Sequence, residues 1–580
     1  MSGTGPSPQA TLTMDLPASI SEPLTSLYGD GRAADTASRL ERLLQEAGST
    51  LRAPPTAPPL SQKDAVLIVY PDQLTEPGRP PLAVLKDFLD QQVRDVITTV
   101  HLLPFFPSSS DDGFAVMDYL EVDPRFGSWD DIRSFGDGYR LMVDAVVNHA
   151  SSRGRWFEAF LRGEEPWRRY FLTPDTRADW SLVVRPRTSP LFTTFETSAG
   201  PSPVWTTFSP DQVDLNYADP DLLVAVIGIL LEYLRRGGQW IRLDAAGFLC
   251  KEPGTTCLHL PQTHSIVRLL RGVIERVAPW ARLITETNVP HADNIAYFGG
   301  GHEAHMIYQF TLAPLVVHAL LTGHAHPLTA WASSLSAPPP GACYLNLLAS
   351  HDGLGLIPAL GWLGEADIDR LLVKAQACGG VSYRAVSGGG SGPYELNANL
   401  FDLLAGPDTL EDESQDDLRR FIVAHAILLT MAGVPAIYFH SLFGSRGDPA
   451  AVGHTGSLRS INRQKLPARD LEAELTPGGR RRQVLEGLRA LLQARALLPA
   501  LHPAAPQEIL DLSPHVFGLR RRSPDGSELI CLAEVGSQPA HLSIRSTDAA
   551  GTDVLLREPV RLDAIRLAPL QARWILVPEA

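Results

Sequence analysis

The segment IRLDAAGF (residues 241–248) begins with a short apolar run and places a carboxylate, Asp244, at the end of that run. Two further segments have the same form and carry Glu286 and Asp352: LITETNVPH (283–291) and ASHDG (349–353). Short, nearly continuous apolar runs are typical of strands that are buried on both faces of a parallel sheet. We therefore expect the three carboxylates at the ends of three parallel strands.

Eight such runs alternate with amphipathic, helix-like stretches. The candidate strands are 66–70, 96–103, 141–147, 240–244, 283–286, 305–310, 345–350 and 434–439. This alternation predicts an α/β protein built on a (β/α)8 barrel, whose active site lies at the carboxyl ends of the strands. The three carboxylates fall at those ends.

The remaining segments predict additions to the barrel. Two intervals are too long for ordinary connections, and the chain beyond residue 500 reads as short strands separated by turn residues. The expected units are an N-terminal extension, partly helical over 34–46 (1–62); the catalytic barrel (63–150 and 218–500); a subdomain inserted after the third strand (151–217); a long active-site loop region within the barrel (361–414); and a C-terminal antiparallel β domain (501–580).

The composition is that of an ordinary globular protein, with 44% hydrophobic and 20% charged residues among 580. The net charge of −15 disfavours binding to nucleic acid or to a membrane surface, because both select basic patches. The five cysteines have no metal-site spacing. The first residues lack the pattern of a secretory signal, so we expect a cytoplasmic enzyme. The expected state of assembly, a monomer or a homodimer, does not follow from any motif.

Three carboxylates at neighbouring strand ends suit the cleavage of a glycosidic bond. That chemistry needs an ionised nucleophile, a protonated acid and negative charge near an oxocarbenium-like transition state. A single Asp or Glu in such a position is as easily a loop or helix cap. The three together, with Arg242 two residues before Asp244 and His351 beside Asp352, favour the catalytic interpretation.

Four segments together resemble the ordered signature regions of the α-amylase clan of glycosidases: DAVVNHAS (144–151), IRLDAAGF, ITETNVPH and ASHDG. The resemblance extends from about residue 65 to the C-terminus. Within the clan the chain is most similar to the sucrose-phosphorylase subfamily, through VHLLPFFPSSSDDGF (100–114), FGSWDDI (126–132) and LRSINR (458–463). The TNVPH stretch, EAHMIYQF (303–310) and PYELN (393–397) resemble the members that act on 2-O-α-glucosyl-D-glycerate.

The resemblance implies roles for the three carboxylates. Asp244 would be the nucleophile that forms a β-glucosyl-enzyme, Glu286 the general acid and later the base, and Asp352 the group that stabilises the transition state. The side chain of Arg242 shares a strand face with Asp244, so it would keep the nucleophile ionised. A retaining mechanism predicts a separation of about 5–5.5 Å between the Asp244 and Glu286 carboxyl groups.

The resemblance also implies a binding site for one glucosyl unit. His149 and His351 match a pair of histidines that hydrogen-bond sugar hydroxyls. Asp112 and Arg459 match an acid–base pair that closes the pocket against the 4-hydroxyl of glucose. Such a closed pocket favours an enzyme that acts on small glucosides.

On the acceptor side, Arg187 matches a phosphate-contacting arginine, and Tyr394, Glu395 and Asn397 occupy an acceptor loop. Sucrose phosphorylases tend to carry Gln where this chain has Glu395, which argues against fructose as the leaving group. Arg187 would bind phosphate and the glycerate carboxylate in turn. Arg384, Arg463 and Lys465 are further candidates for binding the glycerate carboxylate, with surface charge as the favoured interpretation of each.

The leading hypothesis is the reversible phosphorolysis of glucosylglycerate to α-glucose 1-phosphate and D-glycerate, with inorganic phosphate as co-substrate and neither a cofactor nor a metal. Phosphorylases of sucrose, sucrose 6′-phosphate or glucosylglycerol are alternatives. A retaining α-glucosidase or transglucosidase needs the same carboxylates. A non-catalytic, amylase-like binding module does not need them, so the intact triad argues against it.

Overall fold

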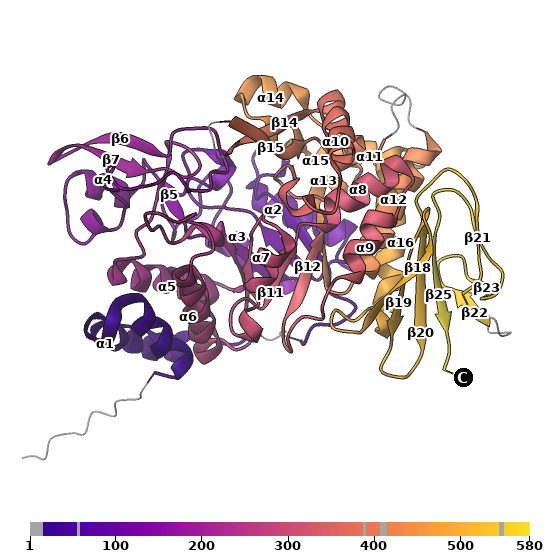
Figure 1. The fold of residues 1–580 in the computed structure, drawn as a ribbon, viewed down its shortest axis with the longest axis horizontal. Helices are drawn as coiled ribbons and strands as arrows, with labels where there is room; N and C mark the ends of the chain where they lie inside the picture. Colours follow the sequence, from indigo (N-terminus) through magenta and orange to yellow (C-terminus); the bar gives the residue numbers. More distant parts are fainter. Residues whose placement is uncertain (1–15, 55–57, 387–389, 406–413, 545–549, 580) are drawn as a thin grey trace, which may run out of the picture.

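The computed structural model describes residues 16–54, 58–386, 390–405, 414–544 and 550–579, and its centre is a closed parallel barrel (Figure 1). Within these residues the spatial order of the eight barrel strands is β1-β16-β12-β11-β10-β9-β4-β3. Their bounds are β1 Val66–Val69, β3 Thr99–Leu102, β4 Arg140–Val146, β9 Gly238–Asp244, β10 Arg282–Thr285, β11 Met306–Gln309, β12 Cys343–Leu347 and β16 Val434–Tyr438. Each lies on one of the eight predicted runs, so the barrel prediction is confirmed.

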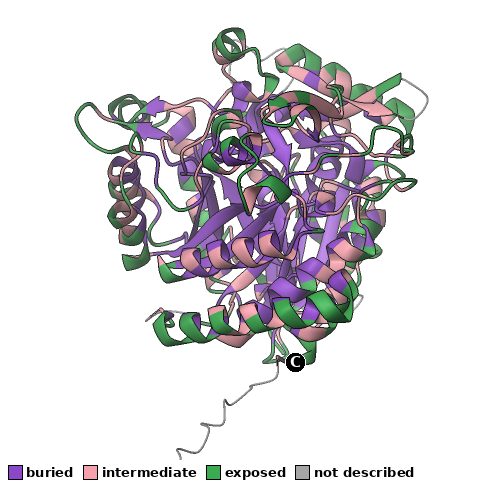
Figure 2. Cartoon of the chain, turned by 90° about the vertical axis from the view of Figure 1, so that its left-hand side faces the viewer, coloured by how far each residue is buried: buried purple, intermediate pink, exposed green. Residues whose placement is uncertain are grey.

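Helices cover the outside of the barrel and leave its strands buried, as Figure 2 shows. The longer ones are α2 Pro81–Gln92, α5 Pro220–Arg235, α6 Pro261–Val277, α8 Leu312–Thr322, α12 Gln415–Thr430 and α16 Arg480–Ala496. Helix α5 illustrates why they form: the Asp219 side chain caps its first turn by accepting from the Asp221 amide, and Pro220 stands at the first helical position. Shorter helices are α3 Trp129–Ser134, α7 His291–Ala296, α9 His326–Ser333, α13 Phe439–Leu442, α14 Pro449–Thr455 and α15 Ala468–Glu474.

The N-terminal extension is more helical than the sequence predicted. Helix α1 spans Ala18–Thr50 with a kink at Gly29, where φ is 69°, whereas the predicted helix covered only 34–46. The earlier part folds because Leu24 and Tyr28 are buried, and this packing overrides the weak helical propensity around the glycine. Figure 1 places α1 beside α5 and α6.

The two long intervals form structure above the carboxyl ends of the strands. In the first, β5 His149–Ser151 pairs with β8 Gln212–Asp214, and the segment between them holds α4 Arg155–Leu161 and a hairpin of β6 Phe192–Thr197 and β7 Gly200–Trp205. In the second, the described residues hold α10 Glu365–Cys378, β14 Gly380–Val386, β15 Gly390–Asn397 and α11 Leu400–Leu404. The predicted loop region is therefore largely regular structure.

A close backbone approach joins the second interval to the barrel. Strand β13, Leu354–Gly355, pairs with β15 just after Asp352. A Cβ atom at Gly353 would lie 2.8 Å from the Glu395 Cβ, so only glycine lets the two segments pack at this distance. The short strands β2 Leu74–Thr75 and β17 Leu466–Pro467 make a further parallel pair at the strand ends.

The chain ends in the predicted antiparallel β domain. Its larger sheet has the order β18-β19-β20-β25-β22-β23, and β21 pairs with β24. The bounds are β18 Gln507–Ser513, β19 Val516–Arg522, β20 Glu528–Glu534, β21 Ala540–Leu542, β22 Ala550–Asp553, β23 Glu558–Arg561, β24 Ile565–Leu567 and β25 Ala572–Val577. Figure 1 shows this domain on the opposite side of the barrel from α1.

Candidate active site

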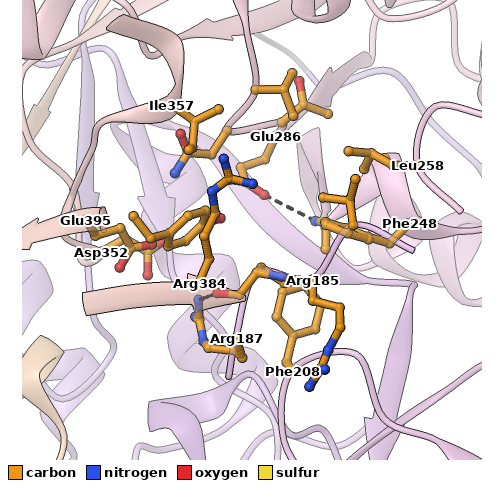
Figure 3. Close-up of a pocket in the computed structure, with 18 of the residues that line it drawn as sticks. Arg185, Arg187, Phe208, Phe248, Leu258, Glu286, Asp352, Ile357, Arg384 and Glu395 are labelled. Carbon is orange, nitrogen blue, oxygen red and sulfur yellow. Dashed lines mark hydrogen bonds between the residues drawn. The ribbon is translucent and has the colours of Figure 1, made fainter. Parts of the chain in front are cut away.

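A cavity of about 500 Å³ lies at the carboxyl ends of the barrel strands, and Asp244, Glu286 and Asp352 all line it. Asp244 is the last residue of β9, Glu286 directly follows β10, and Asp352 lies beyond the end of β12. Figure 3 shows Glu286 and Asp352 among the residues that surround the cavity. The parallel barrel thus brings together three carboxylates that are more than a hundred residues apart at the extremes.

Below this triad, a buried chain of charges holds Asp244. Strand pairing places Asp144 of β4 beside Arg242 of β9, and their side chains form an ion pair. The same Arg242 Nη1 donates to Asp244 Oδ1 at 3.0 Å, and His101 Nε2 lies 2.8 Å from the other oxygen of Asp144. Although burial opposes it, Arg242 and His101 lower the pKa of Asp144 to about 2. The sequence reasoning named Arg242 but missed His101 and Asp144.

The two carboxyls nearest the reaction compete for one proton. Burial raises the pKa of Glu286 to about 7, and nearby Asp244 and Asp352 add to this effect. Burial also raises the pKa of Asp244 to about 7, against the opposing influence of Arg242. Arg242 approaches Asp244 to 3.0 Å and Glu286 only to 3.9 Å. The closer ion pair with Arg242 favours the ionised form of Asp244 more than that of Glu286, although the Ala245 amide also donates to Glu286 Oε2 at 3.2 Å.

The predicted pair of Asp112 with Arg459 is not formed. Arg459 Nη1 lies 2.5 Å from Asp352 Oδ1, and its other nitrogens donate to both oxygens of Glu395, at 2.6 and 3.1 Å. Asp112 accepts instead from Arg463 Nη1 at 2.8 Å. Asp112 does not line the cavity, whereas its neighbour Asp111 does, although both residues have a left-handed backbone, with φ values of 47° and 51°.

Arg463, for which surface charge was the favoured interpretation, lies beside the carboxylates of the site. It is almost fully buried and donates to Asp112 and, at 3.3 Å, to Asp352 Oδ1. Arg459 and Arg463 flank Asp352 and, despite its burial, keep the pKa of Asp352 well below the usual range. The two guanidinium groups thus favour the ionised form of Asp352.

The two histidines lie at the cavity wall as predicted. His149 Nε2 lies 3.0 Å from the Phe114 carbonyl oxygen and 3.1 Å from Gln212 Nε2. His351 stacks on the Phe114 ring at 4.9 Å, and burial lowers the pKa of His351 to about 3. His351 Nδ1 finds no hydrogen-bond partner in the described residues and so can bond a neutral ligand such as a sugar, whereas both ring nitrogens of His149 already have partners. Phe114 adds an apolar surface that the sequence reasoning had not singled out.

The acceptor side of the cavity is formed by the inserted subdomain and the β14–β15 hairpin. The guanidinium of Arg187 lies 5.8 Å from the Phe208 ring centroid and 5.6 Å from that of Tyr394. Tyr394 and Glu395 line the cavity, but Asn397 does not. Asn397 instead donates to Ser382 Oγ at 2.7 Å and so braces the hairpin from behind.

Two further arginines and the TNVPH segment also line this side. Arg185 and Arg384 belong to the cavity wall (Figure 3). Surface charge was the favoured interpretation of Arg384 and a place on the acceptor side the alternative; its position in the cavity wall agrees with the alternative. Asn288 and Pro290, which follow Glu286 closely in the sequence, line the cavity as well.

A lysine ammonium ties the inserted subdomain to the barrel. Lys251 Nζ lies 2.6 Å from Asp214 Oδ2 in β8, 3.0 Å from Asn148 Oδ1 and 2.5 Å from the Phe248 carbonyl oxygen. The side chain is buried. A protein cation thus lies among the oxygen atoms beside Asn148. Across the described ranges, no group of three or more His, Cys, Asp or Glu side chains is arranged to hold a metal ion.

Comparison with known proteins agrees with this geometry. Residues 93–333 match the family described as alpha amylase, catalytic domain. The chain is 45% identical over 538 residues to the glucosylglycerate phosphorylase of Allomeiothermus silvanus, covering 92% of this chain and 95% of that protein. It belongs to the glucosylglycerate phosphorylase family. The predicted resemblance is confirmed, and the chain is a phosphorylase-type glycosyltransferase.

Other relatives place this family within a wider group. The glucosylglycerate phosphorylase of Escherichia coli is 40% identical, over 96% of this chain and 99% of that protein. The sucrose phosphorylase of Agrobacterium vitis is 30% identical, over 70% and 84% respectively. The solved sucrose 6F-phosphate phosphorylase from Thermoanaerobacter thermosaccharolyticum shares the fold, with a TM-score of 0.72 at 22% identity, covering 89% of this chain and all of that one. No helix in the described residues is long and apolar enough to cross a membrane.

Proposed function

We propose that this enzyme catalyses the reversible, retaining phosphorolysis of 2-O-α-glucosyl-D-glycerate to α-glucose 1-phosphate and D-glycerate, with inorganic phosphate as co-substrate and without a cofactor or metal. The observation that carries the proposal is the triad of Asp244, Glu286 and Asp352 on one cavity, in a chain 40–45% identical to three glucosylglycerate phosphorylases. The acceptor side of that cavity supplies arginines for anions.

In the first step, the ionised Asp244 attacks the anomeric carbon. Glu286 donates its proton to the departing glycerate oxygen, and a covalent β-glucosyl-enzyme forms. Two features support this division of roles: Arg242 lies closer to Asp244 than to Glu286, and burial holds a proton on Glu286 near neutral pH. Asp352, held ionised by Arg459 and Arg463, stabilises positive charge at the sugar ring.

In the second step, phosphate takes the place of glycerate. Glu286, now ionised, accepts a proton from the incoming phosphate, whose oxygen displaces Asp244 from the anomeric carbon. Two inversions give net retention, and α-glucose 1-phosphate is released. A retaining mechanism of this kind requires a separation of about 5–5.5 Å between the carboxyl groups of Asp244 and Glu286.

Two groups of neighbouring residues define what the cavity binds. We assign His149, His351 and Phe114 to the glucosyl unit, together with Arg459, which links Asp352 to Glu395. Arg187, held between two aromatic rings, is assigned to phosphate. Tyr394 and Glu395 border the acceptor. Asn397 does not reach it and only stabilises the β14–β15 hairpin that carries them.

A donor comparison tests the proposal. The enzyme is incubated with glucosylglycerate, glucosylglycerol, sucrose and sucrose 6′-phosphate, each with and without phosphate, and glucose 1-phosphate and free glucose are measured. We expect glucose 1-phosphate from glucosylglycerate in the presence of phosphate, at a higher kcat/KM than from the other donors. Glucose release independent of phosphate would contradict phosphorolysis, and faster turnover of sucrose would contradict the assigned donor.

A further inference from the structure

Arg185, Arg187 and Arg384 line the cavity and differ from the other arginines of the site in having no carboxylate partner in the described residues. Arg242, Arg459 and Arg463 are each ion-paired with carboxylates. Three unneutralised guanidinium groups on one side of a cavity create a site for anions.

These three arginines come from two separate walls that meet at the mouth of the cavity. Arg185 and Arg187 lie on the inserted subdomain, and Arg384 lies on β14. An antiparallel bridge between Arg185 and Ala385 holds the two walls together, so the neighbouring Arg384 is brought next to the loop that carries Arg187. Figure 3 labels all three arginines among the residues that surround the cavity.

Arg187 and Arg384 differ in how they are held. Arg187 is fixed between the Phe208 and Tyr394 rings, and its Nη1 donates to the Pro186 carbonyl oxygen at 3.1 Å. Arg384 has a buried Nε that finds no hydrogen-bond partner anywhere in the described residues. A buried guanidinium nitrogen without an acceptor is costly, and a bound oxygen ligand removes that cost.

We propose that Arg384 is the specificity-determining residue for the acceptor's carboxylate, while Arg187 serves phosphate. This proposal rests on the proposed function. In glycerate the carboxylate stands on the carbon next to the reacting hydroxyl, whereas in phosphate the reacting oxygen belongs to the anion itself. The two anionic centres therefore lie at different distances from the anomeric carbon, and separate cations serve them. The acceptor class is alcohols that bear a carboxylate beside the reacting hydroxyl.

The test measures acceptor use without phosphorolysis. α-Glucosyl fluoride glucosylates Asp244 as the carbon–fluorine bond breaks and fluoride leaves, and the acceptor hydroxyl then displaces Asp244 while Glu286 takes its proton. Transfer to D-glycerate, to glycerol and to phosphate is compared in the wild type, Arg384→Gln, Arg384→Lys and Arg187→Gln. Arg419→Gln, at a mostly exposed arginine of α12, is the matched charge control.

We expect Arg384→Gln to raise the KM for glycerate at least about tenfold, because one charge-assisted contact is lost. The KM for phosphate and the rate of transfer to glycerol change less than about threefold, and Arg384→Lys recovers part of the affinity for glycerate. Arg187→Gln shows the opposite pattern, with the larger rise for phosphate. Arg419→Gln matches the wild type.

An unchanged KM for glycerate in Arg384→Gln would overturn the assignment, as would equal rises for glycerate and phosphate. Fluoride release in the absence of acceptor reports whether each variant is folded and able to form the glucosyl-enzyme. Failure of the proposed function has a different signature: the wild type then yields no glucose 1-phosphate from glucosylglycerate, whatever the acceptor preference of the Arg384 variants.

Discussion

The two halves of the cavity are built in different ways. On the glucosyl half, the charged groups come from barrel strands and the segments that follow them, and they are paired with one another: Asp144 with Arg242, and Asp352 with Arg459 and Arg463. On the acceptor half, the cations come from the inserted subdomain and a hairpin, and they form no ion pair with a carboxylate of the described residues. The first half holds a fixed sugar, and the second exchanges one anion for another.

This difference follows from the chemistry. A transition state with developing positive charge is stabilised by groups that do not reorganise, and a closed network of buried ion pairs provides them. An acceptor site that must release glycerate and admit phosphate needs cations whose partners are the ligands themselves. The predictions below probe each half in turn.

The largest effect is expected on the glucosyl half, at the nucleophile. Asp244→Asn removes the attacking carboxylate and should lower kcat by about 10⁴-fold or more. The measurement is the initial rate of glucose 1-phosphate formation, with circular dichroism to establish that the fold is retained. Wild-type turnover in a folded Asp244→Asn protein would show that another residue is the nucleophile.

The junction between the two halves should be sensitive to Lys251. Lys251→Met leaves the Asp214 carboxylate buried without its cation, which should reduce the free energy of unfolding by about 3–5 kcal/mol. Urea denaturation measures this loss, and Lys63→Met, at an exposed position, is the control. Equal stability of the two variants would mean that the ammonium does not hold the inserted subdomain to the barrel.

The pH dependence of kcat/KM should reflect the loss of the proton from Glu286. Since the pKa of Glu286 is raised to about 7 and its acid form cleaves the donor, kcat/KM for glucosylglycerate should fall about tenfold per pH unit above neutrality. The alkaline limb should be lost in Glu286→Gln assayed with α-glucosyl fluoride, whose leaving group needs no acid. Retention of that limb in the variant would assign it to another group.

A small effect is expected on the acceptor half at Phe208. Phe208→Leu removes one of the two rings that hold Arg187, a cation–π contact of about 0.5–1 kcal/mol, and should raise the KM for phosphate about threefold. Fluoride release from α-glucosyl fluoride should not change. A slower release would show that Phe208 acts on the glucosyl half instead.

The glucosyl half was largely predictable from the sequence, and the acceptor half was not. Buried parallel strands have a simple apolar pattern, and residues at their carboxyl ends must converge, so Asp244, Glu286 and Asp352 were placed together from the sequence. The partner of Arg459 was not predictable, because it depends on how closely β15, which carries Glu395, approaches Gly353. Arg384 was only a secondary candidate, because a tertiary contact is what brings its hairpin to the cavity.

Proton and phosphorus NMR of the products that the wild-type enzyme forms from glucosylglycerate and phosphate tests the proposed reaction. We expect α-glucose 1-phosphate and glycerate to form in equal amounts from the first time point, with retention at the anomeric carbon. The appearance of β-glucose 1-phosphate, or of free glucose as the first product, would contradict it.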